Sequence, residues 1–181
     1  MDVLELPDGA AWDAWLVAHP EAPEAWLRIG KRNAGAPYLS IEDALDVALC
    51  HGWIDGHRKG LDDVSFLQRY SPRRKGSSWS AVNVAKAEAM IAAGRMRAGG
   101  LAEIALAKSD GRWQNAYASQ ATAEVPDDLT AALAADPVAA AAFEALGRSE
   151  RYLLILPILK ARTPATRANA VRTAVRSLLP G

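Results

Sequence analysis

Residues 53–70 read WIDGHRKGLDDVSFLQRY, and this stretch decides the fold. Alanine, the best helix former, is frequent on both sides of it, but none occurs between Leu49 and Ser80. The second half of the stretch alternates apolar and polar side chains, which is typical of a half-buried strand. The stretch therefore predicts two strands, over residues 53–58 and 64–70, with a turn between them.

Helices and one further strand are predicted around this centre. Residues 25–31 (AWLRIGK) alternate well enough to form a third strand. Capping residues and apolar spacing predict helices that begin near residues 8, 40, 80, 100, 126, 149 and 163. We expect an α+β fold, a mostly helical single domain over residues 1–181 with a small antiparallel β-sheet near residues 25–70. Residues 120–181 would form the helical C-terminal part of the same domain.

The C-terminal end combines positive charge with apolar helices. Residues 148–181 hold seven Lys or Arg against one acid, Glu150, whereas residues 1–24 hold six acids and no Lys or Arg. Either the two ends lie near each other and partly neutralise, or the C-terminal end is a basic surface for an anionic partner. The helix predicted from Ser149 to Lys160 is apolar on most faces, so we expect it to be buried.

Composition excludes several classes of protein. The chain has 181 residues, 50% of them hydrophobic, and no formal net charge, which excludes a disordered chain and argues against a nucleic-acid binder. Cys50 is the only cysteine, which excludes a disulfide-rich scaffold. The longest apolar runs, such as residues 153–159, are too short to span a bilayer, and residues 1–10 lack the features of a signal peptide. We therefore expect a cytoplasmic protein without a membrane partner.

The common enzyme signatures are absent from the sequence. No nucleophile elbow, zinc-protease motif or glycine-rich nucleotide loop occurs. Cys50, His51 and His57 follow no common zinc spacing, so we expect no metal and no cofactor. Cys50 falls on the apolar side of its predicted helix, which favours a buried, inert thiol.

Asp55 stands in a predicted strand, where aspartate is unfavourable without a partner. Trp53, Asp55 and His57 would share one face of this strand. One interpretation is structural, with Asp55 in an ion pair with Arg69 on the neighbouring strand. The other is functional: Asp55 is a carboxylate in a cleft beside an aromatic ring, and Asp55 or His57 acts as a general base.

Three consecutive cations, beginning with Arg73, precede a serine cluster and a predicted helix start. The free N–H groups of a helix start favour an anion, which Arg73 would hold through charged hydrogen bonds. Trp79 would stack on a ring or wall the site. The alternative interpretation is that Ser80 caps the helix, Asn83 closes the cap and the cations are solvated. The candidate ligand-binding residues are Trp53, Asp55, Arg69, Arg73, Ser78, Trp79, Ser80 and Asn83.

Seven different short motifs follow one another along nearly the whole chain. They are ALCHGWIDG (48–56), RYSPRR (69–74), SSWSAVN (77–83), AAGRMRAGGL (92–101), DGRWQNAY (110–117), EVPDDL (124–129) and the segment that ends at Tyr152. This pattern resembles the YdeI/OmpD-associated family, also called the bacteriocin-protection family. The chain departs from the family pattern at His51, where an aromatic is usual, and at Arg97, where threonine is usual. The family name implies protection against antimicrobial peptides or a link to an outer-membrane porin, but no activity, substrate or cofactor.

Three functions are compatible with these residues. The first is a cytoplasmic, stress-associated protein that binds a small anionic or aromatic ligand between the sheet and the helix starting near Ser80. The second is an enzyme that uses Asp55 or His57 as a general base in the same cleft. The third is an interaction protein that uses the basic C-terminal helix, residues 162–176, to hold an acidic protein or nucleic acid. The zero net charge makes nucleic acid the weaker of these two partners.

Overall fold

The structure is a computed structural model that describes residues 2–32, 35 and 37–180. The chain divides into two compact units. Residues up to 79, together with 83–114, form the N-terminal unit, and residues 80–82, together with those from 115 onward, form the C-terminal unit. Residues 80–82 belong to the second unit because Ser80 pairs with Tyr117 in a single parallel bridge.

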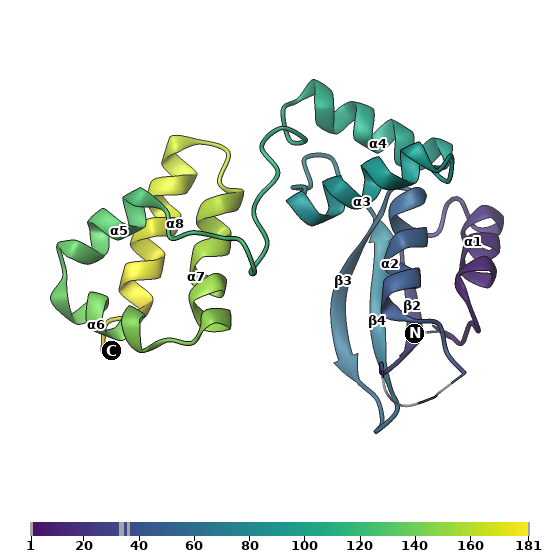
Figure 1. Cartoon of the computed structure of the whole chain (residues 1–181), viewed down its shortest axis with the longest axis horizontal. Helices are drawn as coiled ribbons and strands as arrows, with labels where there is room; N and C mark the ends of the chain where they lie inside the picture. The colour runs from purple at the N-terminus through teal and green to yellow at the C-terminus, as the bar shows by residue number, and fades with distance from the viewer. Residues whose placement is uncertain (1, 33–34, 36, 181) are drawn as a thin grey trace. The chain divides into compact units, whose positions relative to one another are not determined.

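A four-stranded mixed sheet forms the centre of the N-terminal unit (Figure 1). In spatial order its strands are β1 (Val3–Leu4), β2 (Ala25–Gly30), β4 (Ser65–Pro72) and β3 (Trp53–Gly60). β1 runs parallel to β2, and the other two pairs are antiparallel. Asp62 shapes the β3–β4 turn, because its Oδ1 accepts from the N–H groups of Val64 and Ser65 at 3.0 and 2.7 Å. The three predicted strands are confirmed, whereas β1, with two residues, is too short to give an alternating pattern.

Helices α1 (Gly9–Ala18) and α2 (Ile41–Cys50) cover one face of this sheet (Figure 1). Asp8 and Ser40 begin them, since each side chain accepts from the N–H three residues further on, at 2.9 and 3.0 Å. The indole N–H of Trp12 donates to the carbonyl of Ala44 at 3.2 Å and joins the two helices. The core beneath them consists of Trp12, Leu16, Ala25, Leu27, Ile29, Leu39, Ala44, Val47, Ala48, Trp53 and Tyr70.

Two further helices follow the sheet, α3 (Ala81–Ala92) and α4 (Ala98–Ser109). The first turn of α4 approaches the end of α2 closely because it contains glycine. A Cβ atom on Gly100 would collide with the carbonyl oxygen of Cys50, and one on Gly99 would lie 2.7 Å from that of His51. The N–H of Arg97 also donates to the Cys50 carbonyl at 3.0 Å. These contacts hold the segment between α3 and α4 against the C-terminal end of α2.

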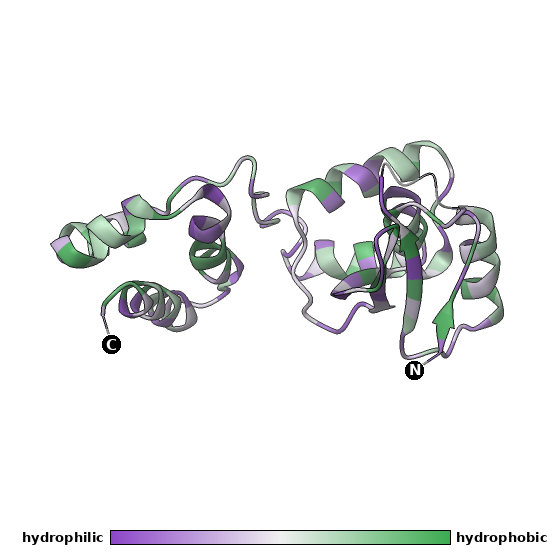
Figure 2. Cartoon of the chain, turned by 90° about the horizontal axis from the view of Figure 1, so that it is seen from below, coloured by the Kyte–Doolittle hydropathy of each residue, from purple (hydrophilic) through white to green (hydrophobic). Residues whose placement is uncertain are grey.

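Within the described residues, four helices make up most of the C-terminal unit. They are α5 (Asp127–Ala134), α6 (Pro137–Ala145), α7 (Arg148–Lys160) and α8 (Pro164–Ser177). Asp136 and Thr163 cap α6 and α8, and a proline follows each cap. The start of α8 is as the sequence predicts, whereas α6 begins where the sequence predicts only an interruption of the helix from residue 126. Figure 2 shows hydrophobic residues recurring along these helices among hydrophilic ones. Their shared core contains Leu129, Leu133, Ala139, Phe143, Ile155, Ile158, Val171 and Ala174. The predicted class, a mostly helical α+β fold, is confirmed, with a mixed rather than a purely antiparallel sheet.

Candidate functional site

The predicted ion pair between Asp55 and Arg69 is wrong, although the two strands do pair. Asp55 lies directly opposite Tyr70 in the β3–β4 register, and Arg69 lies opposite Trp26 on β2. Because side chains alternate along β4, Arg69 and Tyr70 point to opposite faces of the sheet. Arg69 instead pairs with Glu24, with its Nε 2.8 Å from Oε2.

The other residues expected on β3 have ordinary structural positions. Trp53 is buried in the sheet core, where its ring meets that of Trp12 edge-on at 5.9 Å between centroids. Asp55 and His57 are exposed on this edge strand. The strand therefore supplies one core residue and two solvated polar side chains.

Arg73, Ser78 and Trp79 do come together, and they form a buried cluster. Arg73 is only 6% exposed, and its guanidinium lies 3.8 Å from the centre of the Trp79 ring. Its Nη1 donates to the backbone carbonyl of Ser78 at 3.2 Å. Trp79 packs in turn against Trp113, 4.9 Å away between ring centroids. Ser80 pairs with Tyr117 in the C-terminal unit, and Asn83 lies in α3.

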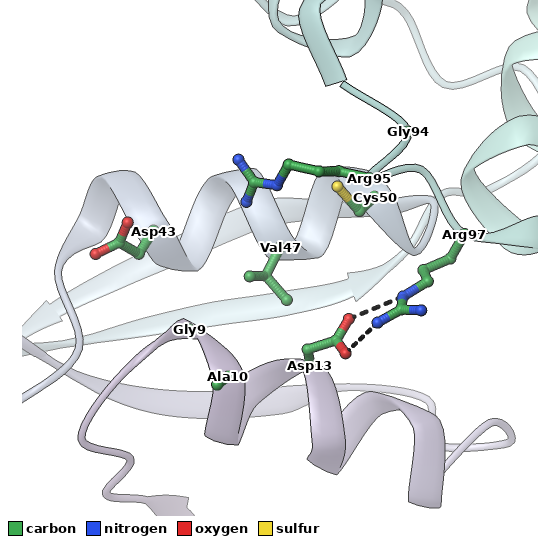
Figure 3. A pocket seen from close by; sticks show the side chains of 9 residues that line it. All are labelled: Gly9, Ala10, Asp13, Asp43, Val47, Cys50, Gly94, Arg95 and Arg97. Atoms are coloured by element: carbon green, nitrogen blue, oxygen red, sulfur yellow. Dashed lines mark hydrogen bonds and ion pairs between the residues drawn. The ribbon is translucent and has the colours of Figure 1, made fainter. Parts of the chain in front are cut away.

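A polar cavity of about 490 Å³ opens elsewhere in the N-terminal unit. It lies between α1, α2 and the segment that joins α3 to α4 (Figure 3). Val47 and Cys50 are its buried members, and the remaining side chains are mostly charged. The lining residues are Gly9, Ala10, Asp13, Asp43, Val47, Cys50, Gly94, Arg95 and Arg97. The predicted ligand-binding residues and the candidate bases Asp55 and His57 are all outside this set.

On one side of the cavity, Asp13 neutralises the charge of Arg97. Its carboxylate accepts from Arg97 Nε at 3.1 Å and from Nη2 at 2.5 Å, and Figure 3 shows the two side chains pointing toward each other. His51 Nε2 lies 2.7 Å from the same carboxylate. The hydrogen bonds from Arg97 lower the pKa of Asp13, with a smaller contribution from His51 that acts in the same direction. The carboxylate is therefore ionised and paired at neutral pH.

Arg95 and Asp43 differ from this pair because neither has an ion-pair partner among the described residues. Both are exposed at the cavity mouth. The backbone N–H of Arg95 donates to the carbonyl of Met90 at 2.9 Å, and in Figure 3 its side chain extends along α2. Asp43 Oδ2 accepts from the hydroxyl of Ser40 at 2.8 Å, but Oδ1 accepts no hydrogen bond from the described residues. The cavity thus presents one unneutralised cation and one unneutralised anion.

Two backbone groups add to the positive side of the cavity. Gly9 and Ala10 begin α1, and the first N–H groups of a helix have no acceptor within it. The Asp8 side chain accepts from the N–H of Ala11, which is the residue after Ala10. Because helix starts carry a partial positive charge, the amides of Gly9 and Ala10 would favour the negative end of a bound molecule.

Cys50 lies in the cavity wall as a buried thiol, as predicted from the helix pattern. It is 4% exposed, and its Sγ is 3.4 Å from Sδ of Met90. Burial raises the pKa of the thiol above its ordinary value, with a smaller opposing effect from Arg95. The thiol is therefore protonated at neutral pH and contributes packing rather than charge.

Sequence reasoning missed this cavity because its residues come from three distant segments. Asp13, Asp43 and Arg95 each resemble an ordinary surface charge when considered alone. One signal was present in the motif AAGRMRAGGL, where two arginines flank a methionine directly after a helix-ending glycine. His51 and Arg97, the two departures from the pattern that these motifs resemble, are the residues that pair with Asp13.

The described part of the chain has neither a cluster of metal ligands nor a helix that could span a membrane. No group of three or more His, Cys, Asp or Glu side chains there has the arrangement to hold a metal ion. No helix in that part is both long enough and apolar enough to cross a bilayer.

Two family models match different parts of the chain. A model described as "Domain of unknown function (DUF8412)" matches residues 4–103. The OmdA model, described as "Bacteriocin-protection, YdeI or OmpD-Associated", matches residues 122–181. The second match confirms the family recognised from the sequence over the C-terminal part, whereas the motifs between residues 48 and 101 fall within the first match. No curated protein and no solved structure matches the chain.

Proposed function

The chain belongs to the DUF8412 domain family through residues 4–103, and we propose that this part of it binds a small molecule with an anionic group in the polar cavity. Arg95 carries the proposal, because it is the lining cation without an ion-pair partner among the described residues. The other lining cation, Arg97, is neutralised by Asp13. A guanidinium binds carboxylate or phosphate oxygens through two parallel hydrogen bonds. The group that Arg95 would bind is therefore an oxyanion.

Asp43 narrows the class of ligand. Its Oδ1 is available at the same cavity, and a carboxylate binds ammonium or other N–H donors. A molecule with an anionic group for Arg95 and a cationic group for Asp43 would satisfy both charges. Among the described residues that line the cavity there is no aromatic side chain, so the lining favours an anionic over an aromatic ligand. We therefore propose a zwitterion of amino-acid type, for which a cavity of about 490 Å³ leaves ample room.

This proposal keeps the anionic ligand expected from the sequence, sets aside the aromatic alternative and moves the binding site. The expected place was the region between the sheet and the helix near Ser80. There the Arg73 guanidinium lies on Trp79 and donates to the Ser78 carbonyl. The cytoplasmic, stress-associated role expected from the sequence stays a prediction.

Calorimetric titration of the full chain with inorganic phosphate, acetate and a panel of α-amino acids tests the proposal. We expect saturable binding, and a loss of about tenfold or more in affinity for Arg95→Ala, because a hydrogen bond to a charged group contributes about 1.5–3 kcal/mol. Asp43→Asn should weaken amino-acid binding and leave acetate binding unchanged. Arg74→Ala is the matched control, since Arg74 is exposed and lies outside the cavity. Equal losses in Arg95→Ala and Arg74→Ala, or no saturable binding of any probe, would contradict the proposal.

A further inference from the structure

Helix α7 is apolar on most faces between Tyr152 and Leu159, but the structure does not bury it as the sequence predicts. Only Ile155 and Ile158 along it are buried. Leu153 is 69% exposed, and Pro157 is also exposed. An exposed leucine alone is ordinary, but a helix that is apolar all round is normally covered on all sides. The outer face of α7 therefore lacks a cover among the described residues of the C-terminal unit.

This face forms one wall of a groove between α7 and α8. The groove has a volume of about 520 Å³, and its apolar lining comes from Leu153, Leu154, Pro157, Ala170 and Ala174. The two helices pack side by side after a short connection (Figure 1). The lining on α8 extends from Thr166 to Ser177, which at 1.5 Å per residue gives a length of about 16 Å. Such a groove accommodates about three turns of a docked helix.

The charge around the groove identifies the chemistry of its occupant. Residues 151–181 contain no Asp or Glu, and their cations are Arg151, Lys160, Arg162, Arg167, Arg172 and Arg176. Arg167 is paired with Asp128 and does not contribute free positive charge. Lys160 lines the groove, and Arg172 and Arg176 are exposed on α8. A second copy docked through the same face would bring like charges together, which is unfavourable. An acidic partner would instead meet complementary charge.

We propose that the groove between α7 and α8 binds an acidic amphipathic helix of a partner protein. Apolar side chains of that helix, spaced i, i+3, i+4 and i+7, contact Leu153, Leu154 and Pro157. Acidic side chains on its flanks lie near Lys160 and the arginines of α8. This site is separate from the polar cavity, which lies in the other unit and takes a small molecule.

The test uses the full chain and a fluorescein-labelled helical peptide of about 12 residues with a leucine stripe and flanking glutamates. Fluorescence anisotropy should show saturable binding that weakens as salt is added. A second peptide, with lysine in place of each glutamate, should bind at least tenfold more weakly. Leu153→Ser should lower the affinity for the acidic peptide about tenfold. Val138→Ser, which replaces a 57% exposed residue of α6 outside the groove, should leave the affinity unchanged.

Several results would overturn this inference. Equal affinity for the two peptides would show that the positive charge around the groove does not select the partner. Equal affinity of wild type and Leu153→Ser for the acidic peptide would show that the peptide binds outside the groove. A dimer seen by sedimentation that Leu153→Ser dissociates would show that a second copy occupies the groove. Circular dichroism of each variant excludes unfolding as the cause of lost binding, and a more conservative Leu153→Ala variant repeats the measurement should the serine variant unfold.

Discussion

At the scale of single residues, Asp13 joins the three elements that enclose the polar cavity. It projects from α1, while His51 follows α2 and Arg97 precedes α4. Both partners reach the same carboxylate, at distances between 2.5 and 3.1 Å. Since Arg97 holds the pKa of Asp13 below its ordinary value, the charged form of the carboxylate stabilises the fold.

Asp13→Asn should therefore lower the free energy of unfolding at pH 7 by about 1–2 kcal/mol, allowing for partial exposure of the pair. The unfolded carboxyl titrates near pH 3.9 and the folded one lower, so this contribution is complete above that range. It is lost as the pH falls through the folded pKa. The difference between wild type and Asp13→Asn should consequently narrow below about pH 4.

Urea denaturation at a series of pH values measures this difference. Asp63→Asn is the matched control, because Asp63 is exposed and forms no ion pair within the described residues. We expect that control to stay within about 0.5 kcal/mol of wild type at pH 7. A difference between wild type and Asp13→Asn that does not change between pH 7 and pH 3 would mean that the Asp13 carboxylate adds no pH-dependent stability.

At the scale of elements, the close approach of α4 to α2 determines where Arg95 and Arg97 lie. The contact depends on the absence of side chains at Gly99 and Gly100, whose Cβ atoms would collide with carbonyl oxygens of residues 51 and 50. In an isolated helix, replacing glycine by alanine would increase helix stability by about 1 kcal/mol. Here the collision outweighs that gain, because backbone atoms cannot move aside as a flexible side chain can.

Gly100→Ala should lower the free energy of unfolding by about 1–3 kcal/mol, in the direction opposite to helix propensity. Gly60→Ala serves as the control, since a Cβ atom there meets nothing within 4 Å. Thermal and urea unfolding of both variants decide the sign. If Gly100→Ala is as stable as wild type, then α4 does not depend on this contact with α2.

The sheet shows which part of an element could be read from the sequence and which could not. Alternation and turn residues predicted β2, β3 and β4 to within a few residues, because these signals are local. The partner of Arg69 could not be predicted in this way. The register of β4 with β2 brings Glu24 within reach of Arg69, and the register of β4 with β3 places Asp55 opposite Tyr70 instead. A shift of one residue in register would place the Arg69 side chain on the opposite face of the sheet.

At the scale of the whole molecule, ion pairs form within each unit. The N-terminal acids Glu5, Asp13 and Glu24 pair with Arg28, Arg97 and Arg69, all in the N-terminal unit. In the C-terminal unit, Arg167 pairs with Asp128. The uneven charge along the sequence therefore does not require the two ends of the chain to neutralise each other.

The whole-molecule view also explains why the candidate site was predicted in a different place. Residues 69–83 are adjacent in sequence, so their cations, serines and tryptophan stand out as a motif. In the structure Arg73 is buried against Trp79, so its charge is directed inward. The cavity instead gathers residues 9–13, 43–50 and 94–97, and only the packing of α1, α2 and α4 brings these together. Tertiary packing of this kind leaves no local pattern in the sequence.

The central claim, that a small anionic or zwitterionic molecule binds at Arg95, is tested most directly by locating the binding site. Backbone amide chemical shifts of the ¹⁵N-labelled chain, followed during titration with phosphate and with the tightest-binding amino acid, provide this measurement. The account predicts saturable shifts at Gly9, Ala10, Gly94 and Arg95, which disappear in Arg95→Ala. Saturable shifts confined to the segment from Arg73 to Ser80, with the cavity residues unmoved, would contradict it.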